Sequence, residues 1–71
     1  MTADELKNAA IEIFGPRGWT TDLADRLKVD RTTVYRYAQG QVAIPGPVDA
    51  AVSCWLAVFR SSGKRPGDGA E

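Results

Sequence analysis

The stretch from Thr20 to Gln39, TTDLADRLKVDRTTVYRYAQ, decides the fold of this chain. Its apolar residues recur at helical spacing on both sides of a short turn. They are Leu23, Ala24, Leu27, Val29, Val34 and Tyr37. The pattern predicts two short helices that cross closely, with Ala24 as the small residue at the crossing. We expect Thr20 to cap the first helix, with Trp19 as its hydrophobic staple, and Asp30 to cap the second.

The segment before this stretch predicts another helix. Thr2-Ala3-Asp4-Glu5 has the spacing of a capping box, in which a threonine and a glutamate satisfy each other's backbone N–H groups. Gly15-Pro16 ends the helix. Its buried face consists of Leu6, Ala10, Ile13 and Phe14.

The segment after the central stretch predicts a last helix over about residues 47–60. Pro47 suits the first position of a helix, with Gly46 at the cap. One apolar stripe then continues at helical spacing through Val48, Ala51, Val52, Trp55, Leu56 and Phe59. We therefore predict a compact all-α domain of four to five helices over residues 1–60. Residues 61–71 are polar and glycine-rich, which predicts a flexible tail.

The composition limits the classes of function. The 71 residues contain one cysteine, Cys54, and no histidine, so neither an intramolecular disulfide nor a zinc site is expected. Paired carboxylates and a glycine-rich phosphate loop are also missing, and we expect neither an enzyme nor a cofactor or small-molecule ligand. No signal peptide or membrane span is expected, and a lone thiol suits a reducing compartment, which favours a cytoplasmic protein.

The net charge is zero, but the charges are unevenly distributed. Residues 1–14 contain Lys7 and three carboxylates. Residues 26–41 contain four cationic side chains, Arg26, Lys28, Arg31 and Arg36, against Asp30 alone. A basic cluster around one short helix is typical of a surface that binds nucleic acid.

From Thr2 to Phe59 the chain resembles the lambda-repressor-like family of helix-turn-helix proteins, the Cro/repressor (XRE) type. The resemblance rests on the stretch Thr20–Gln39, on Gly40 and the Ile44-Pro45 loop, and on the apolar helix beyond them. Small phage and mobile-element regulators, including anti-CRISPR-associated repressors, are similar in size and layout. The family usually has glycine at the position of Lys28. A lysine there must adopt a left-handed backbone at some cost, or the turn must differ.

The resemblance implies that the helix after Asp30 docks in the major groove of DNA with its N-terminal residues first. The implied base contacts are Arg31, Thr32, Tyr35 and Arg36, and the implied phosphate contacts are Thr20, Thr21, Thr33, Gln39 and Gln41. Arginine can pair with guanine, and threonine can touch the methyl group of thymine. The alternatives are that the two arginines solvate a surface helix and that Tyr35 packs on the surface.

The last helix is apolar over a wider arc than one small core can cover. Its second apolar face consists of Ala50, Cys54, Ala57 and Val58. We expect this face to form a homodimer, so that two helices reach half-sites about 34 Å apart. The alternative is that Cys54 and Val58 pack on the first helix.

We expect a sequence-specific regulator of transcription, a repressor or autorepressor that binds an inverted repeat in double-stranded DNA as a homodimer. The competing hypothesis is a protein-interaction module, such as an antitoxin-like partner protein.

Overall fold

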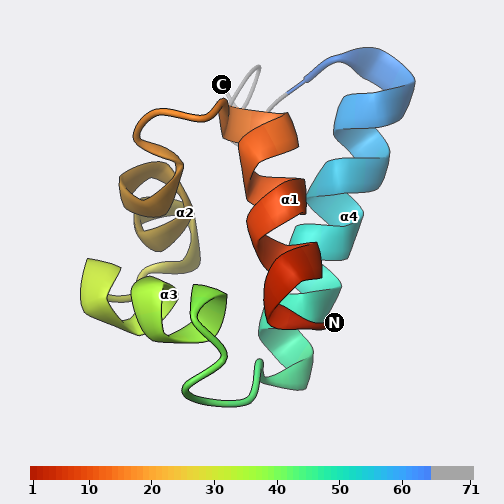
Figure 1. Cartoon of the computed structure of the whole chain (residues 1–71). Helices are drawn as coiled ribbons and strands as arrows, with labels where there is room; N and C mark the ends of the chain where they lie inside the picture. Colours follow the sequence, from red (N-terminus) through yellow and green to blue (C-terminus); the bar gives the residue numbers. More distant parts are fainter. Residues whose placement is uncertain (65–71) are drawn as a thin grey trace.

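The computed structural model describes residues 1–64, which contain four helices and no strand (Figure 1). The helices are α1 (Ala3–Phe14), α2 (Trp19–Leu27), α3 (Arg31–Ala38) and α4 (Gly46–Ser62). The predicted all-α class is confirmed, with four helices. Most of the predicted tail lies outside the described residues.

Helix α1 begins with the predicted capping box. The Glu5 N–H donates to the Thr2 hydroxyl at 3.1 Å, and the Thr2 N–H donates to the Glu5 carboxylate at 2.7 Å. Gly15 ends the helix at φ 95°, and its N–H donates to the Ile11 carbonyl at 2.8 Å. Leu6, Ala10 and Ile13 of the predicted inner face are buried together with Ala9, whereas the predicted Phe14 is half-buried.

Helix α2 begins earlier than predicted, and the proposed cap at Thr20 is wrong. The residue before the helix is Gly18, which has a left-handed backbone (φ 74°), and its carbonyl accepts from the Asp22 N–H at 3.0 Å. Thr20 therefore lies inside the first turn, and Trp19 is the first helical residue instead of a staple before the cap. Asp30 does precede α3, but its side chain forms no capping hydrogen bond.

Helix α4 is also displaced from its predicted bounds. Pro45 is its N-cap, and Gly46 and Pro47 occupy the first turn, where the missing proline N–H breaks no helical bond. The helix continues two residues past Arg60, because Gly63 ends it with a left-handed backbone at φ 73°. The predicted tail therefore starts too early by the two residues 61 and 62.

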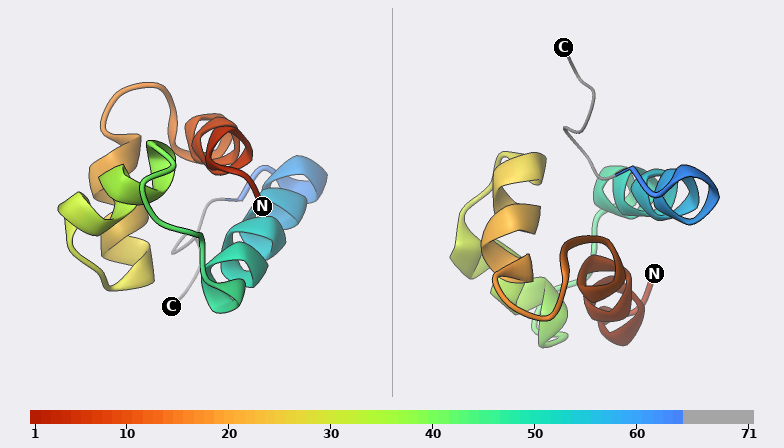
Figure 2. Two further views of the ribbon diagram at one scale, coloured as in Figure 1. Left: turned by 60° about the horizontal axis from the view of Figure 1, so that its bottom comes forward. Right: turned by 90° about the horizontal axis from the view of Figure 1, so that it is seen from above.

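The helices form two pairs: α2 with α3 on one side, and α1 with α4 on the other (Figures 1 and 2). α1 and α4 run side by side in the same direction, and α1 also packs against α2 and α3. The buried core between the pairs consists of Leu6, Ala9, Ala10, Ile13, Leu23, Ala24, Val34, Tyr37 and Val52. Val52 is the one fully buried residue of α4. Within the described residues no helix has the length and apolar character needed to cross a membrane.

Candidate nucleic-acid interface

The predicted DNA contacts converge on an open hollow of about 370 Å³ between α2 and α3. Five residues line this α2–α3 hollow: Thr20, Thr21, Arg31, Thr32 and Tyr35. The first two come from the first turn of α2, and the others come from α3 between Arg31 and Tyr35. The structure thus brings together five of the nine residues that the resemblance implies as DNA contacts.

The turn at Lys28 sets the angle between α2 and α3. Lys28 has φ 62° and ψ 39°, and it is the one non-glycine residue with a positive φ among residues 1–64. The Val29 N–H donates to the Ala24 carbonyl at 3.0 Å, and the Lys28 N–H donates to the Asp25 carbonyl at 3.3 Å. These bonds form a Schellman motif, in which glycine is the usual residue at the left-handed position. The sequence left open whether Lys28 adopts a left-handed backbone or the turn differs. The structure has the first of these, with Lys28 in the strained left-handed conformation.

The C-terminal end of α3 closes with the same Schellman geometry, and its left-handed residue is a glycine. Gly40 lies at φ 74°, and the Gln41 N–H donates to the Arg36 carbonyl at 3.0 Å. This confirms Gly40 as the residue that closes the helix. Gln39 and Gln41 lie at this end, where the Gln41 amide donates to the Gln39 side chain at 3.3 Å.

No side chain of α2 or α3 forms a hydrogen bond or an ion pair within the described part of the chain. The Arg31 guanidinium therefore has five donors available, and the hydroxyls of the α2–α3 hollow are available too. The N–H groups of Thr20 and Thr21 lie in the first turn of α2, where a helix has no internal acceptor for them. The hollow thus presents donors that suit an anion or the acceptor edge of a base.

The charge on this pair of helices is only weakly positive. Residues 19–38 contain four cationic side chains and the three carboxylates Asp22, Asp25 and Asp30, so their net charge is +1. All seven charged side chains belong to exposed residues, and none of the carboxylates pairs with an arginine among residues 1–64. A partner would therefore be held by a few specific contacts more than by a broad positive field.

The other predicted contacts lie outside the α2–α3 hollow. Arg36 is exposed on α3 but does not line the hollow, and Thr33 is half-buried beside the core residue Val34. The Thr33 N–H donates to the Asp30 carbonyl at 3.0 Å. These residues would have to reach a partner around the edge of the hollow.

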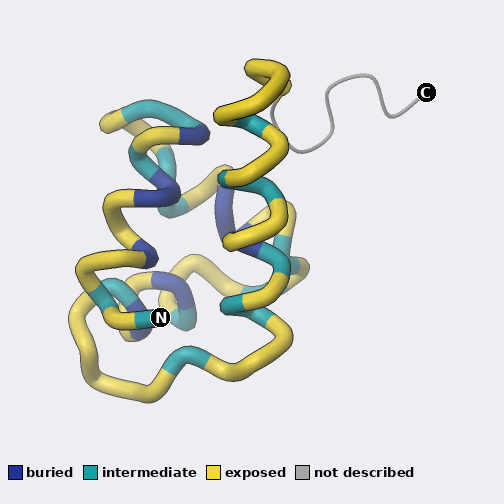
Figure 3. Tube along the Cα trace, turned by 90° about the vertical axis from the view of Figure 1, so that its right-hand side faces the viewer, coloured by how far each residue is buried: buried dark blue, intermediate teal, exposed yellow. Residues whose placement is uncertain are grey.

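The second apolar face of α4 is exposed, as the dimer hypothesis requires of a single chain. All four predicted interface residues, Ala50, Cys54, Ala57 and Val58, are classed as exposed, and Val58 retains 45% of its accessible surface. Figure 3 views α1 and α4 from the right-hand side of Figure 1, and exposed residues recur along α4. The alternative, in which Cys54 and Val58 pack on α1, is not what the structure has.

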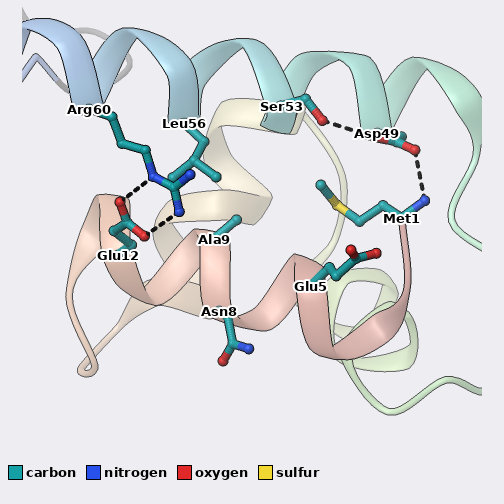
Figure 4. Close-up of a pocket in the computed structure, with 9 residues that line it drawn as sticks. All are labelled: Met1, Glu5, Asn8, Ala9, Glu12, Asp49, Ser53, Leu56 and Arg60. Carbon is teal, nitrogen blue, oxygen red and sulfur yellow. Dashed lines mark hydrogen bonds and ion pairs between the residues drawn. The ribbon is translucent and has the colours of Figure 1, made fainter.

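Two ion pairs that the sequence did not reveal tie α4 to α1 at the two ends of a groove of about 490 Å³ (Figure 4). At one end the Met1 ammonium lies 2.8 Å from the Asp49 carboxylate, which also accepts from the Ser53 hydroxyl at 3.0 Å. At the other end Arg60 donates twice to Glu12, at 2.7 and 2.9 Å. Both pairs join residues 48 positions apart, and local spacing carries no signal for such contacts.

These contacts shift the acid–base properties of the groups involved. The bidentate Arg60 guanidinium lowers the pKa of Glu12. The Met1 ammonium, followed by the Ser53 hydroxyl, lowers the pKa of Asp49, and the Asp49 carboxylate in turn raises the pKa of the Met1 amino group. These charged groups are engaged with one another, in contrast to the unpaired side chains of the α2–α3 hollow.

Within residues 1–64 no three cysteine, aspartate or glutamate side chains gather in a way that could hold a metal ion. A scan against protein-family models, a search of curated proteins and a search of solved structures each found no match for this chain.

Proposed function

We propose that this protein is a sequence-specific regulator of transcription that binds double-stranded DNA through α2 and α3, as the Cro/repressor helix-turn-helix proteins it resembles do. In this proposal it is a repressor that occupies an inverted repeat at a promoter and excludes the polymerase.

The observation that carries the proposal is the α2–α3 hollow itself. The implied contacts Thr20, Thr21, Arg31, Thr32 and Tyr35 all line it, and none of their side chains has a partner within residues 1–64. Unsatisfied donors gathered from two helix N-termini are what a phosphate group and a base edge require. Hydroxyls and N–H groups at the start of α2 would bind the phosphate, while α3 enters the major groove.

The weak net charge of this surface has a consequence for binding. Non-specific affinity for DNA rises with the number of phosphates that cationic side chains neutralise. With Asp22, Asp25 and Asp30 on the same helices, few such contacts are available. The affinity of one subunit would be low, and a second subunit would supply what it lacks.

The exposed face of α4 supports a homodimer. Ala50, Cys54 and Ala57 are small side chains at positions i, i+4 and i+7, which lets a second helix approach closely, and Val58 adds an apolar side chain at the edge. Two chains that pair through this face form an isologous interface. Each would then present one α2–α3 hollow to one half of the repeat.

The decisive experiment selects bound duplexes from a random pool and then measures affinity for the selected site at fixed salt. We expect Arg31→Ala to cost about 1–3 kcal/mol and to relax base preference, and Thr21→Ala to weaken binding to all sequences alike. Lys64→Ala, which removes one positive charge beyond the end of α4, is the matched control and should bind as the parent does. Equal affinity and preference in the parent and Arg31→Ala would reject the proposed docking.

The dimer is tested separately by sizing chromatography over a range of concentrations. Val58→Asp should shift the equilibrium to the monomer, because a carboxylate would be buried in the interface. Val42→Asp makes the same change at a loop valine of equal exposure, 45%, and should leave the dimer intact. A Val58→Asp protein as dimeric as the parent would eliminate this interface.

The exposed α4 face also suits the competing hypothesis, a protein-interaction module such as an antitoxin-like partner. A salt titration with duplex DNA separates the two. Sequence-specific binding that weakens as the salt concentration rises favours the regulator, whereas no enrichment from any pool of sequences favours the interaction module.

A further inference from the structure

The α2–α3 hollow combines one guanidinium with an apolar surface, and this combination indicates which bases it reads. The inference rests on the proposed function. On α3, Arg31 and Tyr35 are four residues apart, and Thr32 and Tyr35 are three apart. Side chains at these separations are neighbours on one helix face, with Cβ atoms about 5–6 Å apart. The three therefore form one patch on α3 between Arg31 and Tyr35.

Arg31 supplies the polar part of this patch. Its guanidinium has no carboxylate or carbonyl partner among residues 1–64, although Asp30 is its neighbour in the chain. In the major groove only guanine offers two acceptors, O6 and N7, that match two parallel guanidinium N–H groups. A base that pairs with both N–H groups of the Arg31 guanidinium would therefore be a guanine.

Tyr35 supplies the apolar part. It retains 57% of its accessible surface, more than any other large hydrophobic side chain of the described residues. Thr32 is exposed beside it and presents a methyl group. The apolar group that base edges offer in the major groove is the C5-methyl group of thymine, and 5-methylcytosine carries the same group at the same position. The ring and the threonine methyl would both cover such a group.

We propose that the α2–α3 hollow reads a two-base step, a C5-methylated pyrimidine immediately 5′ to a guanine. When the edge of the guanidinium pairs with guanine, its flat face turns toward the C5 position of the base on the 5′ side. The methyl group is then enclosed by Arg31, Thr32 and Tyr35, and the strand's phosphate meets Thr20 and Thr21 at the rim of the hollow. Tyr35 is the specificity-determining residue for the methyl group, and Arg31 is the one for guanine.

The test uses the parent protein and the duplex that it selects from a random pool. In the first pair of duplexes, the thymine 5′ to guanine in the selected half-site is compared with uracil. In the second pair, 5-methylcytosine at the same position is compared with cytosine, each placed opposite guanine. Loss of the methyl group should weaken binding about fourfold in each pair, the factor that corresponds to about 0.8 kcal/mol for one buried methyl group. The same replacement at a thymine in the flanking sequence is the control and should have no effect.

Tyr35→Ala assigns the effect to the side chain. Because Tyr35 is exposed, this variant should fold as the parent does, and circular dichroism verifies the fold. It should reduce the methyl effect to below about twofold. Tyr35→Phe keeps the ring and should keep the full effect.

Four outcomes overturn the inference. Equal binding of thymine and uracil duplexes, or a selected site without a pyrimidine–guanine step, rejects the base assignment while DNA binding stands. A methyl effect that is unchanged in Tyr35→Ala rejects the role of the ring. Selection that enriches no sequence at all rejects the proposed function, and the inference with it.

Discussion

Replacing Lys28 with glycine should stabilise this protein, although lysine is the better helix former of the two. At φ 62° the lysine Cβ crowds its own backbone, which costs about 1–2 kcal/mol for a non-glycine residue. Glycine removes that cost, but it loses about 0.4–1 kcal/mol through the greater freedom of the unfolded chain. We expect a net gain of about 0.5–1 kcal/mol in the free energy of unfolding.

Urea denaturation and thermal melting measure this gain. In a domain of this size, 1 kcal/mol corresponds to a rise of about 4–8 °C in the melting temperature. Lys28→Ala is the matched control, because it removes the charge and the long side chain but keeps the Cβ atom and its strain. Lys28→Asn should fall between the two, since asparagine tolerates the left-handed region better than most residues.

Gly40 provides the reverse experiment in the same chain. It has the same left-handed geometry at φ 74°, and a Cβ placed there would lie 3.8 Å from the Ala3 Cβ, an ordinary contact. Gly40→Ala should therefore cost a net of about 0.5–1 kcal/mol, which is the backbone strain less the gain from the more restricted unfolded chain. If Lys28→Gly proves no more stable than Lys28→Ala, the strain argument is refuted.

Three further predictions concern α4 and its contacts with α1. Because the folded-state pKa of Glu12 is lowered, its stabilisation is present above the usual carboxyl pKa of about 4.5 and is lost as pH falls through the lower folded value. Glu12→Gln should therefore flatten the acid side of a melting-temperature profile below about pH 5. The raised pKa of the Met1 amino group acts in the opposite sense, so its stabilisation is lost as pH rises above about 8, and Asp49→Asn should remove that alkaline loss. Val52→Ala should cost about 1–3 kcal/mol in urea denaturation, because it leaves a cavity where α4 meets the core, whereas Val42→Ala at an exposed loop position should be nearly neutral.

The sequence could predict those features that depend on residues a few positions apart. The capping box at Thr2 and Glu5 is an i, i+3 signal, and both of its hydrogen bonds are present. Gly40 follows the last helical turn of α3 at the position where a left-handed residue is needed. The all-α class follows from apolar periodicity, which tertiary packing reinforced and did not override.

Features that arise from packing between distant segments could not be predicted. The pairing of Glu12 with Arg60 depends on α4 lying parallel to α1, and nothing in either segment specifies that register. The predicted start of α2 is wrong because Gly18 precedes the helix with a left-handed backbone and has no side-chain acceptor that would mark it as a cap.

The residues that line the candidate site could be predicted, but the predicted residues that lie outside it could not be told apart from them. The resemblance to the Cro/repressor proteins implies the five lining residues, and the turn at Lys28 brings their two helices together. Gln39 and Gln41 belong to the opposite end of α3, a separation that becomes evident only when the helix is placed in space.

The attachment of α4 to α1 implies a hierarchy of local opening. Helix α4 has 17 residues but contributes only Val52 to the fully buried core, whereas α1 contributes four buried residues. The free energy that holds α4 in place is therefore a fraction of the whole, and its amide hydrogens should exchange with solvent before those of α1. If the chain pairs through α4, exchange in that helix will slow as protein concentration rises, so folding of the last helix and assembly become one coupled equilibrium.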